Sequence, residues 1–255
     1  METAELVDRL DEELSTADYA DVDASANGLQ VGRRSGHVDR VAFAVDGAEM
    51  TVREAAEWNA DLFVVHHGLS WGGIDYVTGR TYDRIAALVD HGIDLYVSHL
   101  PLDGHREFGN AAGIADLLDL RNRRPFGEIG SCTIGQQGTL ETALDSAEIE
   151  LLLANKLDHG GRGIQVLDFG PDTIEDVAIV TGGGADWFDE AVEAGVDAFV
   201  TGEGKGKLYH QAREAGVTVF LGGHYATETF GVRSLADLVD RWGPETTFIE
   251  APTRL

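Results

Sequence analysis

The sequence has little cysteine, little lysine and no long apolar run. The single cysteine, Cys132, excludes an internal disulfide and any zinc cluster built from several cysteines. The longest apolar runs, such as residues 62–65 and 95–97, have the length of strands, so they predict no transmembrane helix. The first 14 residues are acidic and helical in pattern, whereas a signal peptide starts with basic residues and has an apolar core. We therefore expect a cytoplasmic protein that is not bound to a membrane.

Acidic residues greatly outnumber basic ones. The chain contains 45 Asp and Glu against 19 Lys and Arg, which gives a formal net charge of −26. The acids are scattered along a chain with clear apolar periodicity, which a disordered acidic protein would lack. We therefore predict a salt-adapted fold from a halophilic cytoplasm, in which electrolyte screens the repulsion between the acids. The same charge argues against nucleic-acid binding, which needs clustered Lys and Arg.

Predicted strands and helices alternate along most of the chain, which is typical of an α/β fold. The predicted strands cover residues 41–46, 62–68, 93–99, 177–184, 197–204 and 217–224. The predicted helices cover residues 3–15, 50–58, 81–92, 110–120, 186–194, 207–216 and 231–242.

The second half of the sequence repeats the first. Residues 54–68 align without a gap with residues 190–204, with seven identities in 15 positions. The strand sequence HGIDLYV is likewise matched later by AGVTVFL. We interpret these matches as an internal duplication rather than a solenoid, because the repeated unit is too long for a solenoid. The predicted organisation is a first α/β lobe over residues 1–120, a connector over 121–172 and a second α/β lobe over 173–255.

Candidate metal ligands follow the predicted strands in both halves. His66 and His67 end one strand, and His99 and Asp103 follow the next. In the second half, the candidates at corresponding places are Glu203, His224 and Glu228. Ligands bind at the carboxyl ends of strands in α/β sheets, and neutral imidazole with carboxylate suits zinc, iron or manganese. His224 and Glu228 are four residues apart and share one face if that segment is helical. Such a set can hold a dinuclear centre with open positions.

Other interpretations of these residues stay open at this point. A lone histidine at a strand end is usually structural, whereas an adjacent pair is a more specific signal. We interpret His99 as a residue that supports a ligand or contacts substrate. His210 lies on a predicted helix and faces either a cleft, the core or the surface. Gly182 and Gly183 sit between a strand and a helix, where backbone N–H groups can bind phosphate, but a tight turn explains them equally well.

Several motifs together resemble one known family. They are NGLQVG, HHG, SHLPLDGHREFGN, TGGG, DAFVTGEG and GGHYATETFGV, which occur in this order along the whole chain. The combination is similar to the Nif-three-like family, whose bacterial members are named as type-2 homologs of GTP cyclohydrolase I. The resemblance implies a dinuclear site of iron, zinc or manganese on His66, His67, Asp103, His224 and Glu228. It also implies two similar lobes with this site in the cleft between them, and a homohexamer with the metals facing an inner cavity.

Two functions are compatible with these residues. The first is a metal-dependent hydrolase that acts on a small nucleotide-like substrate, in which Glu203 or His99 moves protons or holds the substrate, with His210, Gly182 and Gly183 as further substrate contacts. The alternative is a non-enzymatic protein that handles iron or binds a regulatory partner. This alternative is motivated by the lack of an arginine clamp for a triphosphate, since only Arg106 and Arg213 lie near the candidate ligands in sequence.

Overall fold

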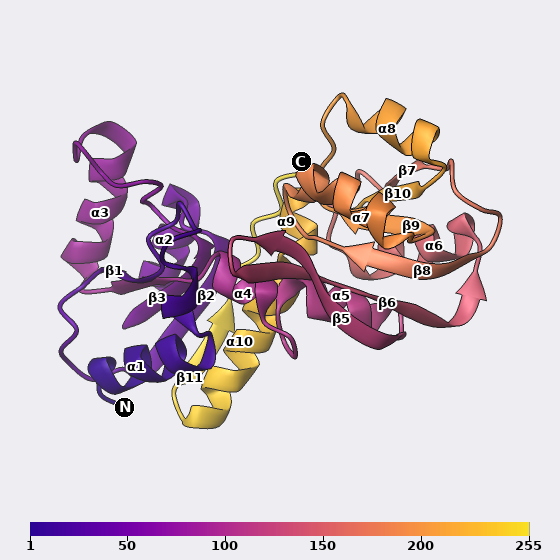
Figure 1. The fold of residues 1–255 in the computed structure, drawn as a ribbon. Coiled ribbons are helices and arrows are strands. Elements are labelled where there is room, and N and C mark those ends of the chain that lie inside the picture. Colours follow the sequence, from indigo (N-terminus) through magenta and orange to yellow (C-terminus); the bar gives the residue numbers. More distant parts are fainter. Residues whose placement is uncertain (255) are drawn as a thin grey trace. The chain divides into compact units, whose positions relative to one another are not determined.

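The computed structural model describes residues 1–254, and these form two compact units (Figure 1). The first unit comprises residues 1–102 and 232–251, and the second comprises residues 103–231 and 252–254. The last residue of the predicted second lobe, 255, lies outside the described residues. None of the helices within residues 1–254 has the length and apolar character needed to cross a membrane.

The first unit is built on a five-stranded sheet in the order β1-β4-β3-β2-β11. Its strands are β1 (Gly28–Val31), β2 (Arg40–Asp46), β3 (Leu62–His67), β4 (Asp94–Val97) and β11 (Glu245–Phe248). Strands β4, β3, β2 and β11 are parallel, and β1 pairs antiparallel with β4 at one edge. Strand β3 is buried along nearly its whole length, as its unbroken apolar run predicts for a central parallel strand.

Helices pack on this sheet through their apolar faces. They are α1 (Thr3–Glu13), η1 (Thr16–Tyr19), α2 (Glu49–Glu57) and α3 (Gly79–His91). Val52 of α2 and Leu88 of α3 join Phe63 and Leu95 of the sheet in one buried cluster. Helix α3 ends at His91 and is followed by Gly92, which adopts a left-handed conformation with φ of 69°, so the end of the helix predicted over residues 81–92 is confirmed to within one residue.

The second unit has a six-stranded sheet in the order β5-β6-β8-β9-β10-β7. Its strands are β5 (Leu120–Ile129), β6 (Cys132–Leu144), β7 (Gln165–Leu167), β8 (Ile174–Ile179), β9 (Ala198–Thr201) and β10 (Thr218–Leu221). Strands β8, β9 and β10 are parallel. The β5–β6 hairpin extends the sheet beyond β8, and β7 pairs antiparallel with β10.

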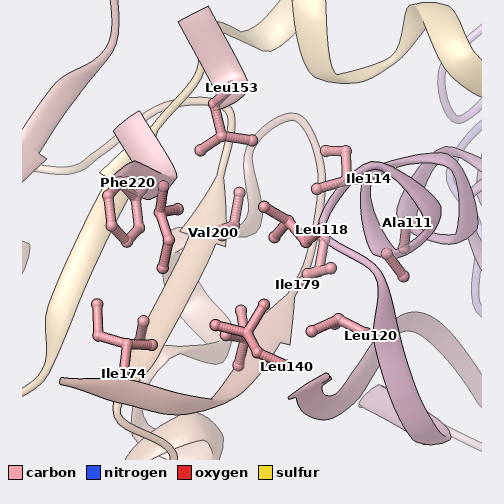
Figure 2. Close-up of a cluster of buried hydrophobic side chains, with 14 of the residues drawn as sticks. Ala111, Ile114, Leu118, Leu120, Leu140, Leu153, Ile174, Ile179, Val200 and Phe220 are labelled. Carbon is pink, nitrogen blue, oxygen red and sulfur yellow. The ribbon is translucent and has the colours of Figure 1, made fainter. Parts of the chain in front are cut away.

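The helices of the second unit pack around an aliphatic core. They are α5 (Asn110–Leu117), α6 (Ser146–Lys156), η2 (Gly184–Trp187), α7 (Phe188–Ala194), α8 (Leu208–Ala215) and α9 (His224–Thr227). Figure 2 shows Ile114 and Leu153 from the helices against Ile179, Val200 and Phe220 from the strands. Two further helices, α4 (Leu100–Gly104) and α10 (Thr229–Trp242), begin in one unit and end in the other.

The compact units divide the chain differently from the predicted lobes. Residues 121–172, predicted as a connector, form most of β5 together with β6, α6 and β7, and their strands belong to the second sheet. Residues 232–251 return to the first unit, where β11 pairs with β2. These pairings join segments far apart in sequence, so the order of elements along the chain does not reveal them.

The duplication predicted from the sequence is confirmed by the strand order. In each unit, three parallel strands follow one another, and a short antiparallel strand borders the third. The pairing registers also match, since Val41 lies opposite Leu62 in the first unit and Val177 lies opposite Ala198 in the second. The fold is therefore α/β with two similar halves.

One polar contact is repeated in both halves. The carboxylate of Asp61 accepts hydrogen bonds from the backbone N–H groups of two consecutive residues at the start of β2, each at 2.9 Å. Asp197 does the same at the start of β8, at 2.9 and 3.0 Å. Each aspartate fixes the amino end of one strand against the neighbouring strand. This sets the register of the strands whose carboxyl ends carry the candidate ligands.

Candidate metal-binding half-sites

Three histidines gather at the carboxyl edge of the first sheet. His66 and His67 end β3, and His99 directly follows Ser98 after β4. One nitrogen of each imidazole lies within 4.8 Å of those of the other two. The ring centroid of His66 is 4.7 Å from that of His67 and 5.1 Å from that of His99. His66 is fully buried and the other two are partly buried, so this group faces a restricted space.

Each of these imidazoles is fixed through its Nδ1 atom. The partners are the carbonyl of Ser98 for His66, Asp46 Oδ1 for His67 and Asp23 Oδ1 for His99, each at 2.9 Å. Because these partners are acceptors, Nδ1 carries the hydrogen, and in a neutral ring Nε2 then carries the lone pair. Metal-ligating histidines in proteins are oriented in this way.

Asp23 fixes His99 from a buried position. Its side chain is 1% exposed, and it also accepts hydrogen bonds from the backbone of Ser25 and Leu100 and from the amide of Asn27. Burial by itself raises the pKa of Asp23, but the hydrogen bond and charge of His99, aided by the other donors, outweigh it and lower the pKa below its usual value. The orientation of His99 is therefore set by a carboxylate that stays ionised.

Trp71 lies beside the three histidines. The centroid of its ring system is 4.9 Å from that of His99 and 5.9 Å from that of His67, yet the residue is 47% exposed. It lies in the exposed segment between β3 and α3. The sequence pattern did not single out Trp71, Asp23 or Asp46. Asp46 could have been recognised from the sequence as a neighbour of His67, because it ends the strand next to β3.

In the second unit, His224 lies between two carboxylates. Its Nδ1 is 3.3 Å from Oε1 of Glu203, and its Nε2 is 3.2 Å from Oε1 of Glu228. Burial lowers the pKa of His224, but the hydrogen bonds and charges of Glu228 and Glu203 outweigh this and raise the pKa to about 9. Without a competing cation the imidazole is therefore protonated at neutral pH, and a metal ion has to replace that proton. Glu228 is 3% exposed, whereas about half of the Glu203 side chain is exposed.

Gly182 makes room for Glu228. A Cβ atom at this position would lie 2.0 Å from Oε1 of Glu228 and 3.1 Å from Nε2 of His224. Its φ of 57° is also a conformation that side chains disfavour. The backbone N–H of Gly182 donates to Oγ1 of Thr227 at 3.0 Å, so this group is already used within the fold. Gly183 contacts the same region more loosely, with Glu203 and His224 atoms 3.8 and 3.9 Å from a Cβ placed there.

Asp103 is held by a separate set of contacts in the second unit. It is 6% exposed, and its Oδ1 accepts hydrogen bonds from Nδ2 of Asn110 at 2.8 Å and from Oγ1 of Thr181 at 3.0 Å. Oδ1 of Asn110 accepts in turn from the backbone N–H of Gly231 at 2.8 Å. These donors keep the carboxylate oriented.

His210 takes a different position from the other predicted residues. It lies exposed on α8, and its ring packs edge-on against Tyr209 with centroids 5.4 Å apart. Its backbone N–H donates to the carbonyl of Lys207 at 3.2 Å. The structure thus groups Glu203 with His224, Glu228 and the two glycines, and it leaves His210 on the outer face of its helix.

Two groups of side chains offer donor atoms that fit divalent transition metals, and we call each group a half-site. The first half-site is His66, His67 and His99, and the second is His224 with Glu203 and Glu228. The first unit offers three imidazoles with Nε2 as the basic atom, and the second offers an imidazole with nearby carboxylates. Neutral imidazole and carboxylate are the ligand types that zinc, iron and manganese accept. The space that Gly182 keeps clear around Glu228 is a further feature that a simple strand-to-helix turn does not require.

Comparison with known proteins agrees with these motifs. The sequence model of the family described as Duf34/NIF3 (NGG1p interacting factor 3) matches residues 1–254. The chain belongs to the DUF34/NIF3 family. The resemblance stated from the motifs is thereby confirmed.

Relatives within the DUF34/NIF3 family match the chain over its full length. A protein of Halobacterium salinarum named GTP cyclohydrolase 1 type 2 homolog is 57% identical over 255 residues, with complete coverage of both chains. A solved structure of a protein called ybgI, titled as of unknown function, is 33% identical with a TM-score of 0.91 and complete coverage of both chains. The crystal structure of TTHA1606 from Thermus thermophilus is 37% identical with a TM-score of 0.87, again over both full chains.

Proposed function

We propose that this protein binds two divalent metal ions through His66, His67, Asp103, His224 and Glu228, and that it is a metal-dependent hydrolase acting on a nucleotide-like substrate. The observation that carries the proposal is the set of three imidazoles in the first unit, each with Nδ1 bound to an oxygen and Nε2 left as the basic atom. Iron, zinc and manganese all suit this donor set.

Chain connectivity supports a joint role for the two half-sites. The chain passes from the first unit to the second between residues 102 and 103, and His99 and Asp103 are only four positions apart. It returns between residues 231 and 232, four positions after Glu228. Four residues span at most about 14 Å when fully extended. Both crossings therefore lie within a few residues of a proposed ligand.

Glu203 and His99 are the groups we assign to proton transfer and substrate contact. When bound, divalent ions supply Lewis acidity toward a substrate oxygen and toward water. Glu203 is half-exposed with one oxygen near His224, so its carboxylate can accept or return a proton at the second oxygen. His99 keeps its hydrogen on Nδ1 through Asp23, which leaves Nε2 to accept a proton or a hydrogen bond.

The test begins with metal content. Protein purified without oxygen is expected to contain close to two metal ions per chain by elemental analysis, and His67→Ala and Glu228→Ala are expected to lose at least one. His91→Ala is a matched control, because His91 is an exposed histidine at the end of α3, outside the half-site. Unchanged metal content in both ligand variants would contradict the proposal.

Activity is tested separately from metal binding. Metal-loaded protein is expected to hydrolyse a member of a nucleotide and phosphoester collection, and Glu203→Gln is expected to lower kcat while the metal content is kept. If the loaded protein hydrolyses nothing but passes iron to an acceptor protein, the non-enzymatic iron-handling role replaces the hydrolase role. Slow metal loss together with turnover supports the enzyme.

Assembly and environment form a further part of the proposal. We infer from the family resemblance and from the net charge of −26 that the protein works as a homohexamer in a salt-rich cytoplasm. Light scattering in molar KCl is expected to give six chains of 27.4 kDa. A monomer under those conditions would remove the hexamer from the proposal.

A further inference from the structure

A cavity of about 220 Å³ opens in the second unit beside Glu203. Three separate parts of the chain contribute its walls: the segment that follows α6, the ends of β9 and β10, and the C-terminal segment. Gly202, Gly204 and Gly223, which have no side chains, line the cavity at the strand ends. His159 and Arg162 line it from the segment after α6, and Arg254 lines it from the C-terminal segment.

Two guanidinium groups at one cavity are unusual for this chain. Lys and Arg number only 19 against 45 acids, so basic residues are scarce and any two of them are expected to lie far apart or to pair with acids. Nη1 of Arg162 donates to the backbone carbonyl of Arg254 at 3.1 Å, which ties the two segments together. Within residues 1–254, no ion pair with a carboxylate is recorded for either arginine.

The remaining contacts position donors around the cavity. A Cβ atom on Gly160 would lie 2.6 Å from Cγ of Arg254, so the stem of this arginine packs directly on the glycine backbone. The backbone N–H of Gly163 donates to Nδ1 of His159 at 3.0 Å. Neutral His159 therefore carries its hydrogen on Nε2, which makes that atom a donor as well.

The geometry points to a phosphoryl-binding subsite formed by Arg162, Arg254 and His159. A phosphate monoester carries a charge of about −1.5 to −2 at neutral pH and three strong acceptor oxygens, and it matches two guanidinium groups and one imidazole N–H. A single carboxylate group needs only one guanidinium partner, so it uses this donor set less fully. Arginine is also the residue that binds phosphate in a bidentate manner.

The subsite refines the proposed function and rests on it for the identity of the ligand as a substrate. Glu203 lines the same cavity and lies 3.3 Å from the imidazole of His224. A small molecule whose phosphoryl group sits between the two arginines is therefore next to the carboxylate that we assign to proton transfer. This predicts a phosphorylated small molecule as the substrate class. It also provides the arginine pair that was not apparent from the sequence, because Arg162 and Arg254 are 92 positions apart.

The test measures binding without metal or turnover. The full chain is treated with a chelator and kept at the lowest KCl concentration that preserves its circular dichroism spectrum. Inorganic pyrophosphate and GMP are then titrated by calorimetry and by phosphorus NMR. The wild-type protein is expected to bind both, and Arg162→Ala and Arg254→Ala are each expected to weaken binding tenfold or more. Arg162→Lys and Arg254→Lys are expected to recover part of the loss, which separates charge from packing.

Arg213→Ala is the matched control. Arg213 is an exposed arginine on α8 of the same unit, with its guanidinium 6.0 Å from the centroid of the Phe169 ring, and it does not line the cavity. The variant is expected to bind pyrophosphate as the wild-type protein does. Equal affinity in the wild-type, R162A and R254A proteins would overturn the subsite, as would the absence of binding at millimolar ligand.

The same variants separate this inference from the proposed function. If the wild-type protein binds GMP through these arginines but the metal-loaded form hydrolyses nothing, the subsite stands and the hydrolase proposal fails. If the protein hydrolyses a phosphorylated substrate with unchanged KM in R162A and R254A, the hydrolase proposal stands and the subsite fails. A rise in KM with little change in kcat supports both.

Discussion

The two halves of the molecule share a frame but present different chemistry at its edge. Counting from the paired strands, His66 and His67 of the first unit correspond to Gly202 and Glu203 of the second. Asp46, which orients His67, corresponds to Gly182, which makes room for Glu228. The first unit thus offers imidazoles fixed by oxygens, and the second offers carboxylates around a glycine turn. The duplication conserved the positions of the strand ends, while the residues placed there diverged into complementary donors.

The largest effect is expected from salt, and it tests whether the two halves respond alike. Acidic residues are spread over both units, so repulsion should destabilise both in dilute buffer. Raising KCl from dilute to molar is expected to add several kcal/mol of stability, which for a chain of this size is a rise in Tm of about 10 °C or more. Scanning calorimetry measures this shift. Full stability in dilute buffer would contradict it, and a shift confined to one of two transitions would show that the halves differ.

Gly182→Ala tests the glycine that distinguishes the second edge from the first. The new Cβ would collide with Glu228, and we expect a loss of about 1–3 kcal/mol of unfolding free energy together with reduced metal content. Gly195→Ala is the control, because Gly195 also has positive φ, 72°, but nothing lies within 4 Å of its added Cβ. The control is expected to lose only about 1 kcal/mol and to keep its metal. Equal behaviour of the two variants would show that Gly182 serves the turn alone.

Asp46→Asn and Asp23→Asn test the oxygens that orient the imidazoles of the first unit. Asp46→Asn replaces the carboxylate that accepts from Nδ1 of the proposed ligand His67, and it is expected to weaken metal binding by about 10–100-fold, because such partners set the orientation and basicity of a ligand. Asp23→Asn acts on His99, which we assign to proton transfer and substrate contact, so it is expected to lower kcat while the metal affinity is kept. Competition with a fluorescent chelator measures the affinity. Asp90→Asn, an exposed change at the end of α3, is expected to have no effect. Unchanged metal affinity in Asp46→Asn would leave His67 as a packing residue, and unchanged kcat in Asp23→Asn would remove the role assigned to His99.

The smallest effect concerns the aspartates repeated in both frames. Asp61→Ala and Asp197→Ala each remove a carboxylate that accepts two backbone N–H groups. We expect each to cost about 1–2 kcal/mol in urea unfolding, because both sites are partly exposed and water replaces part of the interaction. Asp61→Asn and Asp197→Asn keep one acceptor oxygen and are expected to cost less. A loss in only one of the two alanine variants would break the equivalence of the frames.

Local pattern predicted the parts of the site that lie on regular elements. The apolar run before His66 and His67 predicted their strand, and the observed bounds of β3 differ from the prediction by one residue. The predicted pairing of His224 with Glu228 is also present, although for a different reason. Helix α9 ends at Thr227 and α10 begins at Thr229, so Glu228 lies at a break between helices, yet it still reaches His224 at 3.2 Å.

Contacts between distant segments could not be predicted in this way. Asp23 and His99 are 76 positions apart, and nothing in the irregular segment around Asp23 marks it as the partner of a histidine. The pairing of β11 with β2 is similarly invisible, because many strand orders satisfy the same alternation of helix and strand. Sequence pattern therefore specified elements and their ends, while the partners that orient the side chains required the fold.

The pairing of β11 with β2 has a consequence for synthesis on the ribosome. Chains are made from the N-terminus, and domains generally fold as units as they emerge. The first unit needs residues 245–248 to complete its sheet, so the second unit, apart from its last few residues, is available to fold earlier although it comes later in the chain. Until residues 245–248 are available, β2 has an exposed edge that is able to pair with strands of other nascent chains.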